Sequence, residues 1–315
     1  MKKPLIVLAG PTAVGKTKAS IHLAAAIGGE IISADSMQVY KELTIGTAKI
    51  TPEEMQGIPH YLIDVLEPDQ EFHVVKFQQM AKQAMEEIYK KGKIPILVGG
   101  TGFYIQALIY DIDFTENETD SSYRMELEQL AKERGSTYLH DLLKGVDEKA
   151  AQEIHAHNLK RVIRALEFYK QTGNKISKHN EKERQKESPY ELCFFVLTDE
   201  RTHLYQRINQ RIDLMMKQGL LEEVKSLKAK GYTKDMVAMQ GLGYKELLSY
   251  LDGTYTLEEA VTVLKRDTRH FAKRQLTWFK RERNVIWIDK SQYQYVDEDI
   301  ERVMLENVKE RLSIL

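Results

Sequence analysis

The chain has 315 residues and a single cysteine, Cys193, which lies in the apolar run 192–197. One thiol excludes an internal disulfide and a cysteine-rich zinc site, and it is typical of proteins of a reducing compartment. No apolar stretch approaches the ~20 residues that a membrane-spanning helix needs. The sequence passes from Met1-Lys2-Lys3 directly into an apolar run. We therefore expect no signal peptide, no membrane partner and a cytoplasmic location.

Arginine is scarce in one half of the chain: none precedes Arg124, and all fifteen follow from there. The formal net charge is −1, so total charge favours no class of partner. Residues 160–184 carry eight Lys/Arg against three acids, and residues 265–283 carry eight against two, with aromatic residues interleaved. Such segments are typical of surfaces that bind looped or single-stranded RNA. The alternatives are composition drift and solvated helix faces, with Trp278 and Phe279 in the core.

One glycine-rich segment matches the phosphate-loop motif G-x-x-x-x-G-K-[ST]. It follows the apolar run 5–9, which we interpret as a buried strand, and it precedes a helix-compatible stretch at 16–27. Backbone N–H groups and the helix N-terminus of such a loop bind polyphosphate, while its lysine reaches the terminal phosphates and its hydroxyl binds Mg²⁺. The motif predicts a bound di- or triphosphate and leaves open whether that is a nucleotide. Its residues are Gly10, Pro11, Thr12, Ala13, Val14, Gly15, Lys16 and Thr17.

The first part of the chain alternates strand and helix patterns, as in a parallel sheet with crossover helices. We predict strands at 5–9, 30–34, 61–65 and 94–98, and helices at 16–27, 74–91 and 102–110.

Residues 113–187 show helical periodicity and no strand signal, so we interpret them as an all-helical insertion. Beyond them we predict strands at 190–197 and 285–288 and helices at 202–230, 244–251, 257–280 and 296–312. The predicted fold class is α/β: a P-loop parallel sheet flanked by helices, formed by residues 1–112 and 188–315, with the helical domain inserted at 113–187.

Polar residues follow the predicted strands where ligands bind in open α/β sheets. Asp35 ends the strand at 30–34, where a carboxylate would serve as a general base opposite the phosphate loop. The alternative is that Asp35 caps the following turn. The glycine-rich turn at 99–102 either holds a phosphate or a base edge through Thr101, or forms a tight helix entry.

One acidic residue is missing from this edge. The strand 94–98 ends in Gly-Gly-Thr, whereas P-loop ATPases carry an aspartate that holds Mg²⁺. Asp64 is the only other candidate. We therefore expect Mg²⁺ to be bound by Thr17, phosphate and water, which argues against a motor ATPase.

Taken together, these motifs resemble the bacterial tRNA dimethylallyltransferases. The resemblance extends over nearly the full length and keeps the motif order. The segments that carry it are 10–17, 35–40, 46–49, 99–104, 161–167, 239–246 and 274–279.

The resemblance implies transfer of a dimethylallyl group from dimethylallyl diphosphate to the exocyclic amine of the adenine beside the anticodon, with release of diphosphate. It implies that Asp35 is the base on that amine and that Lys16, Thr17 and Arg211 neutralise the diphosphate, with Mg²⁺ at Thr17. The insertion would clamp the anticodon stem-loop of the tRNA, and we expect a monomer. The implied tRNA contacts are Asp35, Ser36, Met37, Gln38, Thr101, Tyr123, Lys160, Arg161, Val162, Ile163 and Arg164.

Two other functions use the same loop. A small-molecule kinase would bind ATP there and use Asp35 on a hydroxyl, but it has no need of the downstream basic helices. An RNA-binding NTP switch would have no need of Asp35.

Overall fold

The computed structural model describes residues 2–114 and 121–312. The chain forms two compact units: a core unit, Met1–Asp111 with Ser188–Leu315, and a helical unit, Ile112–Glu187. The predicted insertion, 113–187, falls in the helical unit.

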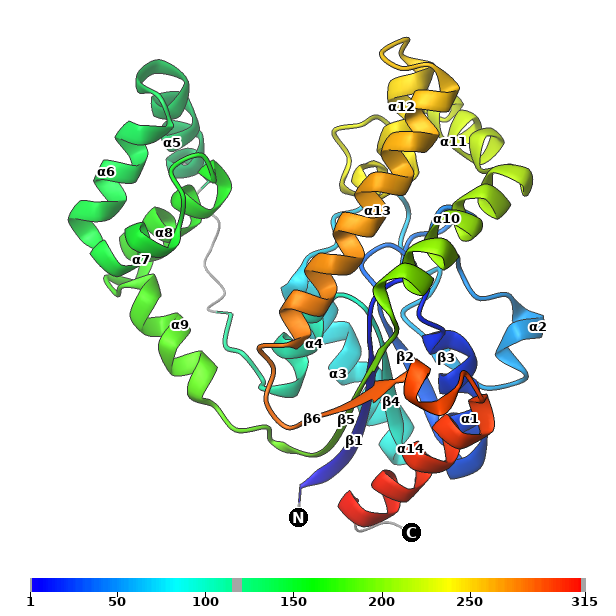
Figure 1. Cartoon of the computed structure of the whole chain (residues 1–315). Helices are drawn as coiled ribbons and strands as arrows, with labels where there is room; N and C mark the ends of the chain where they lie inside the picture. Colours follow the sequence, from blue (N-terminus) through cyan, green and yellow to red (C-terminus); the bar gives the residue numbers. More distant parts are fainter. Residues whose placement is uncertain (1, 115–120, 313–315) are drawn as a thin grey trace. The chain divides into compact units, whose positions relative to one another are not determined.

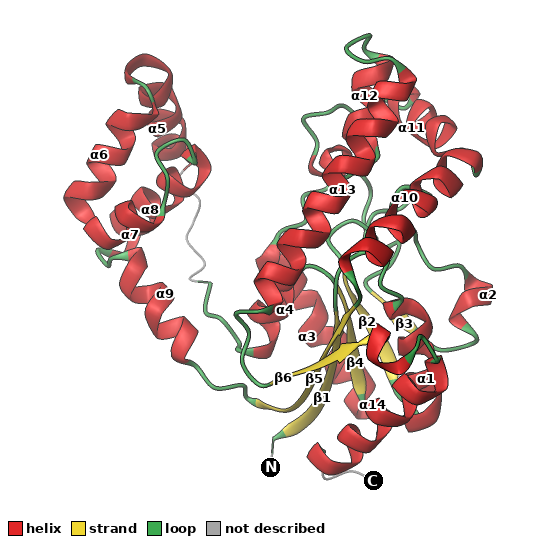
Figure 2. Ribbon diagram, viewed as in Figure 1, coloured by secondary structure: helices red, strands yellow, loops and turns green. Residues whose placement is uncertain are grey.

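A six-stranded parallel sheet forms the centre of the core unit within the described ranges (Figure 2). Its strand order is β3-β2-β4-β1-β5-β6. The inner strands are buried and rich in Ile, Val and Leu, as expected for a sheet covered on both faces. The strands are β1 (Lys3–Ala9), β2 (Glu30–Ala34), β3 (His60–Tyr61), β4 (Pro95–Gly99), β5 (Tyr190–Thr198) and β6 (Val285–Asp289).

The register of three neighbouring strands fixes which loops meet. Ala9 of β1 pairs with Gly99 of β4, and Gly99 pairs with Ala34 of β2. The next residue of each strand therefore begins a loop at the same level, so that the phosphate loop, the glycine-rich turn and Asp35 emerge at one edge of the sheet.

Helices cover both faces of the sheet. Figure 1 shows α1 with α14 on one side of the strands and α3 with α4 on the other, while α10–α13 pack together beyond the carboxyl edge. Two short 3-10 segments complete this unit: η1 (Val237–Gln240) lies between α11 and α12, and η2 (Lys290–Tyr293) lies between β6 and α14. The helices are α1 (Lys16–Ile27), α2 (Pro52–Met55), α3 (Val74–Lys90), α4 (Gly102–Ile109), α10 (Arg201–Lys217), α11 (Leu220–Ala229), α12 (Tyr244–Leu251), α13 (Leu257–Phe279) and α14 (Asp297–Arg311).

Two predictions of local structure are wrong. The strand expected at 61–65 stops at Tyr61, because Leu62 and Asp64 take positive φ angles of 64° and 54°. The single helix expected at 202–230 is two helices, because Gly219 takes a left-handed conformation with φ of 102°. The apolar spacing continues through this break, so periodicity alone did not reveal it.

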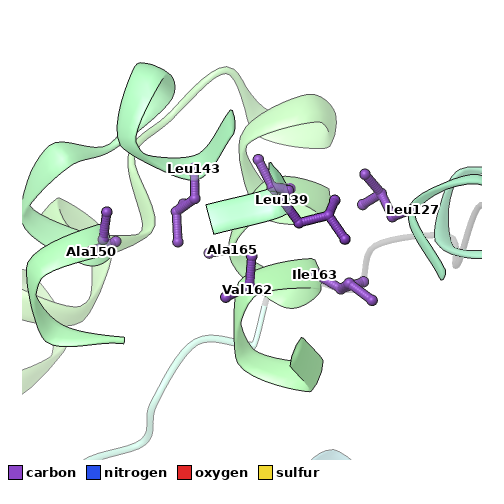
Figure 3. Close-up of a cluster of buried hydrophobic side chains, with 9 residues drawn as sticks. Leu127, Leu139, Leu143, Ala150, Val162, Ile163 and Ala165 are labelled. Carbon is purple, nitrogen blue, oxygen red and sulfur yellow. The ribbon is translucent and has the colours of Figure 1, made fainter. Parts of the chain in front are cut away.

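The helical unit has its own apolar core (Figure 3). Leu139 and Leu143 from α6 are fully buried, and Leu127, Val162 and Ile163 complete the core from α5 and α8. Its helices are α5 (Ser121–Arg134), α6 (Ser136–Val146), α7 (Glu148–Glu153), α8 (Leu159–Thr172) and α9 (Ile176–Gln185).

A buried carboxylate anchors the amino end of β2. The side chain of Glu30 is 1 % exposed and accepts hydrogen bonds from Tyr61 Oη at 2.7 Å, Lys93 Nζ at 2.8 Å and Lys91 Nζ at 3.0 Å. Burial opposes its ionisation, but these bonds outweigh burial and lower the pKa of Glu30 to about 2. Glu30 thus ties β2 to β3 and to the segment that leads into β4.

We predict that Glu30→Gln lowers the free energy of unfolding at pH 7 by about 2 kcal/mol, since it removes a buried ionic partner of two half-exposed lysines. The stabilisation by Glu30 is fully present above its unfolded pKa, near 4.5, and is lost as the pH falls towards about 2. Urea unfolding at pH 7 and at lower pH measures this contribution to the free energy of unfolding. The control is Glu86→Gln, which breaks the exposed pair with Lys3 and should cost less than about 0.5 kcal/mol. Equal costs for the two variants would contradict the assignment.

Candidate active site

Cationic side chains hold the phosphate loop in shape between β1 and α1. Lys16 Nζ lies over the loop and donates to Gly10 O at 2.9 Å and to Pro11 O at 2.8 Å. From α10, Arg207 Nε donates to Ala13 O at 2.8 Å. Two positive groups from distant parts of the sequence therefore meet at the carbonyl oxygens of this loop.

Positive charge is concentrated beside the loop. Desolvation of the ammonium and the nearby Arg211 guanidinium lower the pKa of Lys16 to about 7, against the opposing effect of Asp35. Desolvation and the neighbouring Arg207 also lower the pKa of Arg211. Crowded, desolvated cations of this kind favour an anionic ligand, because it would relieve their mutual repulsion.

Two adjoining cavities lie next to these cations. The first has a volume of about 490 Å³ and includes Lys16 and Thr17 in its polar lining. The second, of about 330 Å³, has a mainly apolar lining that includes Met215. Asp35 and Arg211 line both, so a bound molecule that spans the cavities passes between a carboxylate and a guanidinium.

Asp35 caps the turn that follows β2 through one of its two carboxylate oxygens. Its Oδ1 accepts hydrogen bonds from Met37 N at 2.8 Å and Gln38 N at 3.3 Å, which caps the turn after β2. No described residue donates a hydrogen bond to Oδ2. One oxygen thus fixes the carboxylate, and the other is available to take a proton.

The glycine-rich turn is tied to the phosphate loop by a glutamine of α13. Gln275, which is 6 % exposed, accepts from Thr12 N at 2.9 Å and donates through Nε2 to Gly100 O at 2.9 Å. A Cβ atom at Gly100 would lie 2.1 Å from Gln275 Nε2, so only glycine permits this approach. The same turn forms a tight helix entry, because Thr101 is the N-cap of α4.

Most of the predicted residues of the core unit meet at this site, while Gly10, Pro11 and Val14 are buried beneath it. Asp64 lines neither cavity and forms an ion pair with Lys49, so it is not placed to hold a metal there. The predicted residues that line one or both cavities are Thr12, Ala13, Gly15, Lys16, Thr17, Asp35, Ser36, Met37, Gln38, Thr101 and Arg211.

The remaining predicted residues belong to the helical unit. Tyr123 is half-buried, and Lys170 Nζ lies 3.7 Å from the centre of its ring. Lys160, Arg161 and Arg164 of α8 are exposed. Val162 and Ile163 are buried in the core of this unit (Figure 3), so their side chains serve packing and hold the exposed basic residues in place.

Among residues 2–114 and 121–312, no group of three or more His, Cys, Asp or Glu side chains is arranged to hold a metal ion. The Thr17 hydroxyl, at the N-terminus of α1, is an oxygen donor of the kind that Mg²⁺ prefers. In the same described part of the chain, no helix has both the length and the apolar character to cross a membrane.

Residues to which the sequence assigned no role also contribute to the site. Gln275 falls inside the motif 274–279 but had no assigned role. Arg207 lies four residues before Arg211, and this spacing indicates that the two arginines share one face of the helix. Phe271 and Arg274 of α13 also line the apolar cavity.

The fold and the site show that the chain is a P-loop α/β protein. Its phosphate loop and a carboxylate lie beside a polar and an apolar cavity. The IPP transferase family model matches residues 38–282, more than half of the chain. The chain therefore belongs to the IPP transferase family.

Relatives cover nearly the whole chain. A protein of Lachnoclostridium phytofermentans named tRNA dimethylallyltransferase is 62% identical over 92% of this chain and 93% of its own. The crystal structure of the tRNA isopentenylpyrophosphate transferase of Bacillus halodurans is 46% identical, covers 98% of both chains and has a TM-score of 0.74. A eukaryotic dimethylallyltransferase acting on tRNA is 30% identical, with a TM-score of 0.81 over 97% of this chain and 79% of its own.

We predict that Gly100→Ala and Gln275→Ala are strongly non-additive. The new methyl group would displace the Gln275 amide and break both of its hydrogen bonds, at a cost of about 1–2 kcal/mol in the free energy of unfolding. The same bonds are absent from Gln275→Ala, so the double variant should cost little more than either single one. Urea unfolding of the three variants gives the coupling.

Gly145→Ala is the matched control, because a Cβ atom at Gly145 meets nothing within 4 Å. It should cause no loss of stability. Additive costs at Gly100 and Gln275 would show that the two residues do not share the interaction described here.

Proposed function

We propose that the protein transfers the dimethylallyl group of dimethylallyl diphosphate to the exocyclic amine of the adenine beside the anticodon of tRNA. The observation that carries this proposal is the pair of adjoining cavities: a polar one at the phosphate loop and a mainly apolar one, with Asp35 and Arg211 lining both. A diphosphate joined to a five-carbon apolar chain has the same division into a charged and an apolar part. The names of the relatives support the same reaction.

The cations beside the phosphate loop would promote departure of the diphosphate. Lys16 and Arg211 line the polar cavity, and Arg207 holds the loop from behind. As the bond between the allylic carbon and the diphosphate oxygen breaks, negative charge grows on the leaving group. Fixed cations in a desolvated site stabilise this charge, and such stabilisation is usually the largest single contribution to catalysis.

Asp35 would act on the acceptor. The amine nitrogen forms its new bond to the allylic carbon and loses one proton, which Asp35 Oδ2 is free to accept while Oδ1 stays bonded to the turn. An adenine turned out of its stack would be held by the residues after β2 and by Thr101, which line the cavities.

Mg²⁺, when bound, would supply further positive charge to the diphosphate. Thr17 would hold it, together with phosphate oxygens and water. The exposed Lys160, Arg161 and Arg164 of the helical unit would bind the tRNA stem-loop. The single, buried thiol of Cys193 supports a cytoplasmic location.

Mass spectrometry of tRNA after incubation with dimethylallyl diphosphate and Mg²⁺ tests the reaction directly. We expect the wild-type protein to add one five-carbon unit to adenine, and Asp35→Asn to lose most of the turnover while keeping its affinity for tRNA, since only the proton acceptor is removed. Ser188→Ala, at a residue outside both cavities, is the control and should keep full activity.

A parallel assay of ATP turnover distinguishes the kinase and the NTP switch. ATP consumption without modified tRNA would refute the proposed function. Full activity of Asp35→Asn would refute only the assignment of the base.

We predict that Arg161→Ala with Arg164→Ala weakens tRNA binding and flattens its salt dependence. Each lost phosphate contact should reduce the slope of log K against log[salt] by about 0.7–0.9. Filter binding at several salt concentrations measures this slope, and Lys144→Ala, at another exposed lysine of the helical unit, is the control. An unchanged slope in the double variant would remove these arginines from the RNA-binding surface.

A further inference from the structure

A short loop between β2 and α2 forms one wall of the site. Gly46, Thr47 and Ala48 of this loop line the apolar cavity, and Thr47 and Ala48 also line the polar one. The loop is irregular, so its shape depends on the contacts that other elements make with it.

A carboxylate from a distant helix binds the outer side of this loop. Glu223 of α11 accepts hydrogen bonds through Oε2 from Thr44 N at 3.1 Å and Ile45 N at 2.7 Å, and through Oε1 from Gly46 N at 3.1 Å. Tyr244 Oη donates to the same Oε1 at 2.7 Å. Three consecutive backbone N–H groups converging on one anion form a nest, and here the protein fills the nest with its own side chain.

The ring of Tyr244 also packs closely against this loop. Tyr244 is fully buried, and a Cβ atom at Gly46 would lie 2.6 Å from its ring. The ring and the carboxylate therefore hold the loop together, and Gly46 is required at this point of contact.

The inner side of the loop contacts the residues that would hold the acceptor. Gln38 Nε2 donates to Thr47 O at 3.2 Å and to Ala48 O at 3.4 Å. Gln38 N in turn donates to Asp35 Oδ1 at 3.3 Å. A chain of contacts thus runs from Glu223 through the loop and Gln38 to Asp35, whereas Glu223 itself lines neither cavity.

We infer that Glu223 is a positioning residue for the acceptor adenine. It fixes the loop 44–49, the loop fixes the amide of Gln38, and Gln38 helps to orient Asp35. The phosphate loop is held by a separate set of contacts, from Lys16 and Arg207, so the groups that would bind the diphosphate of the donor are not held by Glu223. This inference rests on the proposed function.

The four hydrogen bonds to Glu223 need an acceptor at both of its side-chain oxygens. A carboxylate accepts all four hydrogen bonds, whereas the amide of a glutamine would turn an N–H group towards some of the same donors. Glu223→Gln therefore keeps the size of the side chain and disrupts the nest.

Steady-state kinetics with tRNA and dimethylallyl diphosphate test the inference. We expect Glu223→Gln to raise KM for tRNA about tenfold and to lower kcat, while KM for the donor changes by less than about twofold. Tyr244→Phe, which removes one of the four bonds, should shift KM for tRNA in the same direction by about threefold. Glu222→Gln is the control. Glu222 is the exposed neighbour of Glu223 in the sequence and pairs only with Lys225 among the described residues, so this variant should behave as wild type.

Hydrogen exchange gives a second readout that does not need turnover. The amides of Thr44, Ile45 and Gly46 should exchange faster in Glu223→Gln than in wild type, while those of the phosphate loop should not change. If Glu223→Gln does not fold, Tyr244→Phe carries both measurements.

Three outcomes would overturn the inference. The first is that Glu223→Gln keeps the wild-type KM for tRNA and the wild-type kcat. The second is that its KM for the donor rises as much as its KM for tRNA, which would mark a general loss of structure. In either case wild type and Glu222→Gln stay active, so the proposed function survives. The third outcome is a wild-type protein without activity, which would overturn the proposed function and the inference together.

Discussion

The pairing of β1, β4 and β2 is the constraint on which the site depends. Because Ala9, Gly99 and Ala34 lie side by side in a parallel sheet, the three loops that follow them begin at one level. The phosphate loop and the Asp35 carboxylate therefore line the same cavity, although they belong to different loops of the chain. A shift of one residue in this register would exchange the side chains that pack on the two buried faces of the sheet, so the packing of the core protects the geometry of the site.

Later parts of the chain then complete this edge. Gln275 bonds to Thr12 across 263 residues of sequence, and Glu223 holds the loop at residues 44–46 from α11. Arg211 adds its charge from α10. The loops after the amino-terminal strands supply the phosphate loop and Asp35, and the carboxyl-terminal helices supply Arg211 and the contacts that fix these loops. This division explains why the core unit needs both segments of the chain.

The sequence predicted what local pattern determines. The phosphate loop, its flanking strand and helix, and Asp35 at a strand end are found where the motif spacing puts them, because each follows from residues close in sequence. The break at Gly219 was not predicted, because the apolar spacing runs through it. Val162 and Ile163 lie inside a basic segment and are nevertheless buried, because every helix of this unit must bury one side. Gln275 and Glu223 were missed because their roles exist only in tertiary contacts.

The central claim is that the phosphate loop binds the diphosphate of a prenyl donor and not a nucleoside triphosphate. Calorimetric titration with a dimethylallyl diphosphate analogue that resists ionisation, compared with ATP and repeated for Lys16→Ala, tests it most directly. The account predicts binding of the analogue in the presence of Mg²⁺, its loss in Lys16→Ala and weaker binding of ATP. Tight binding of ATP with no binding of the analogue would contradict it.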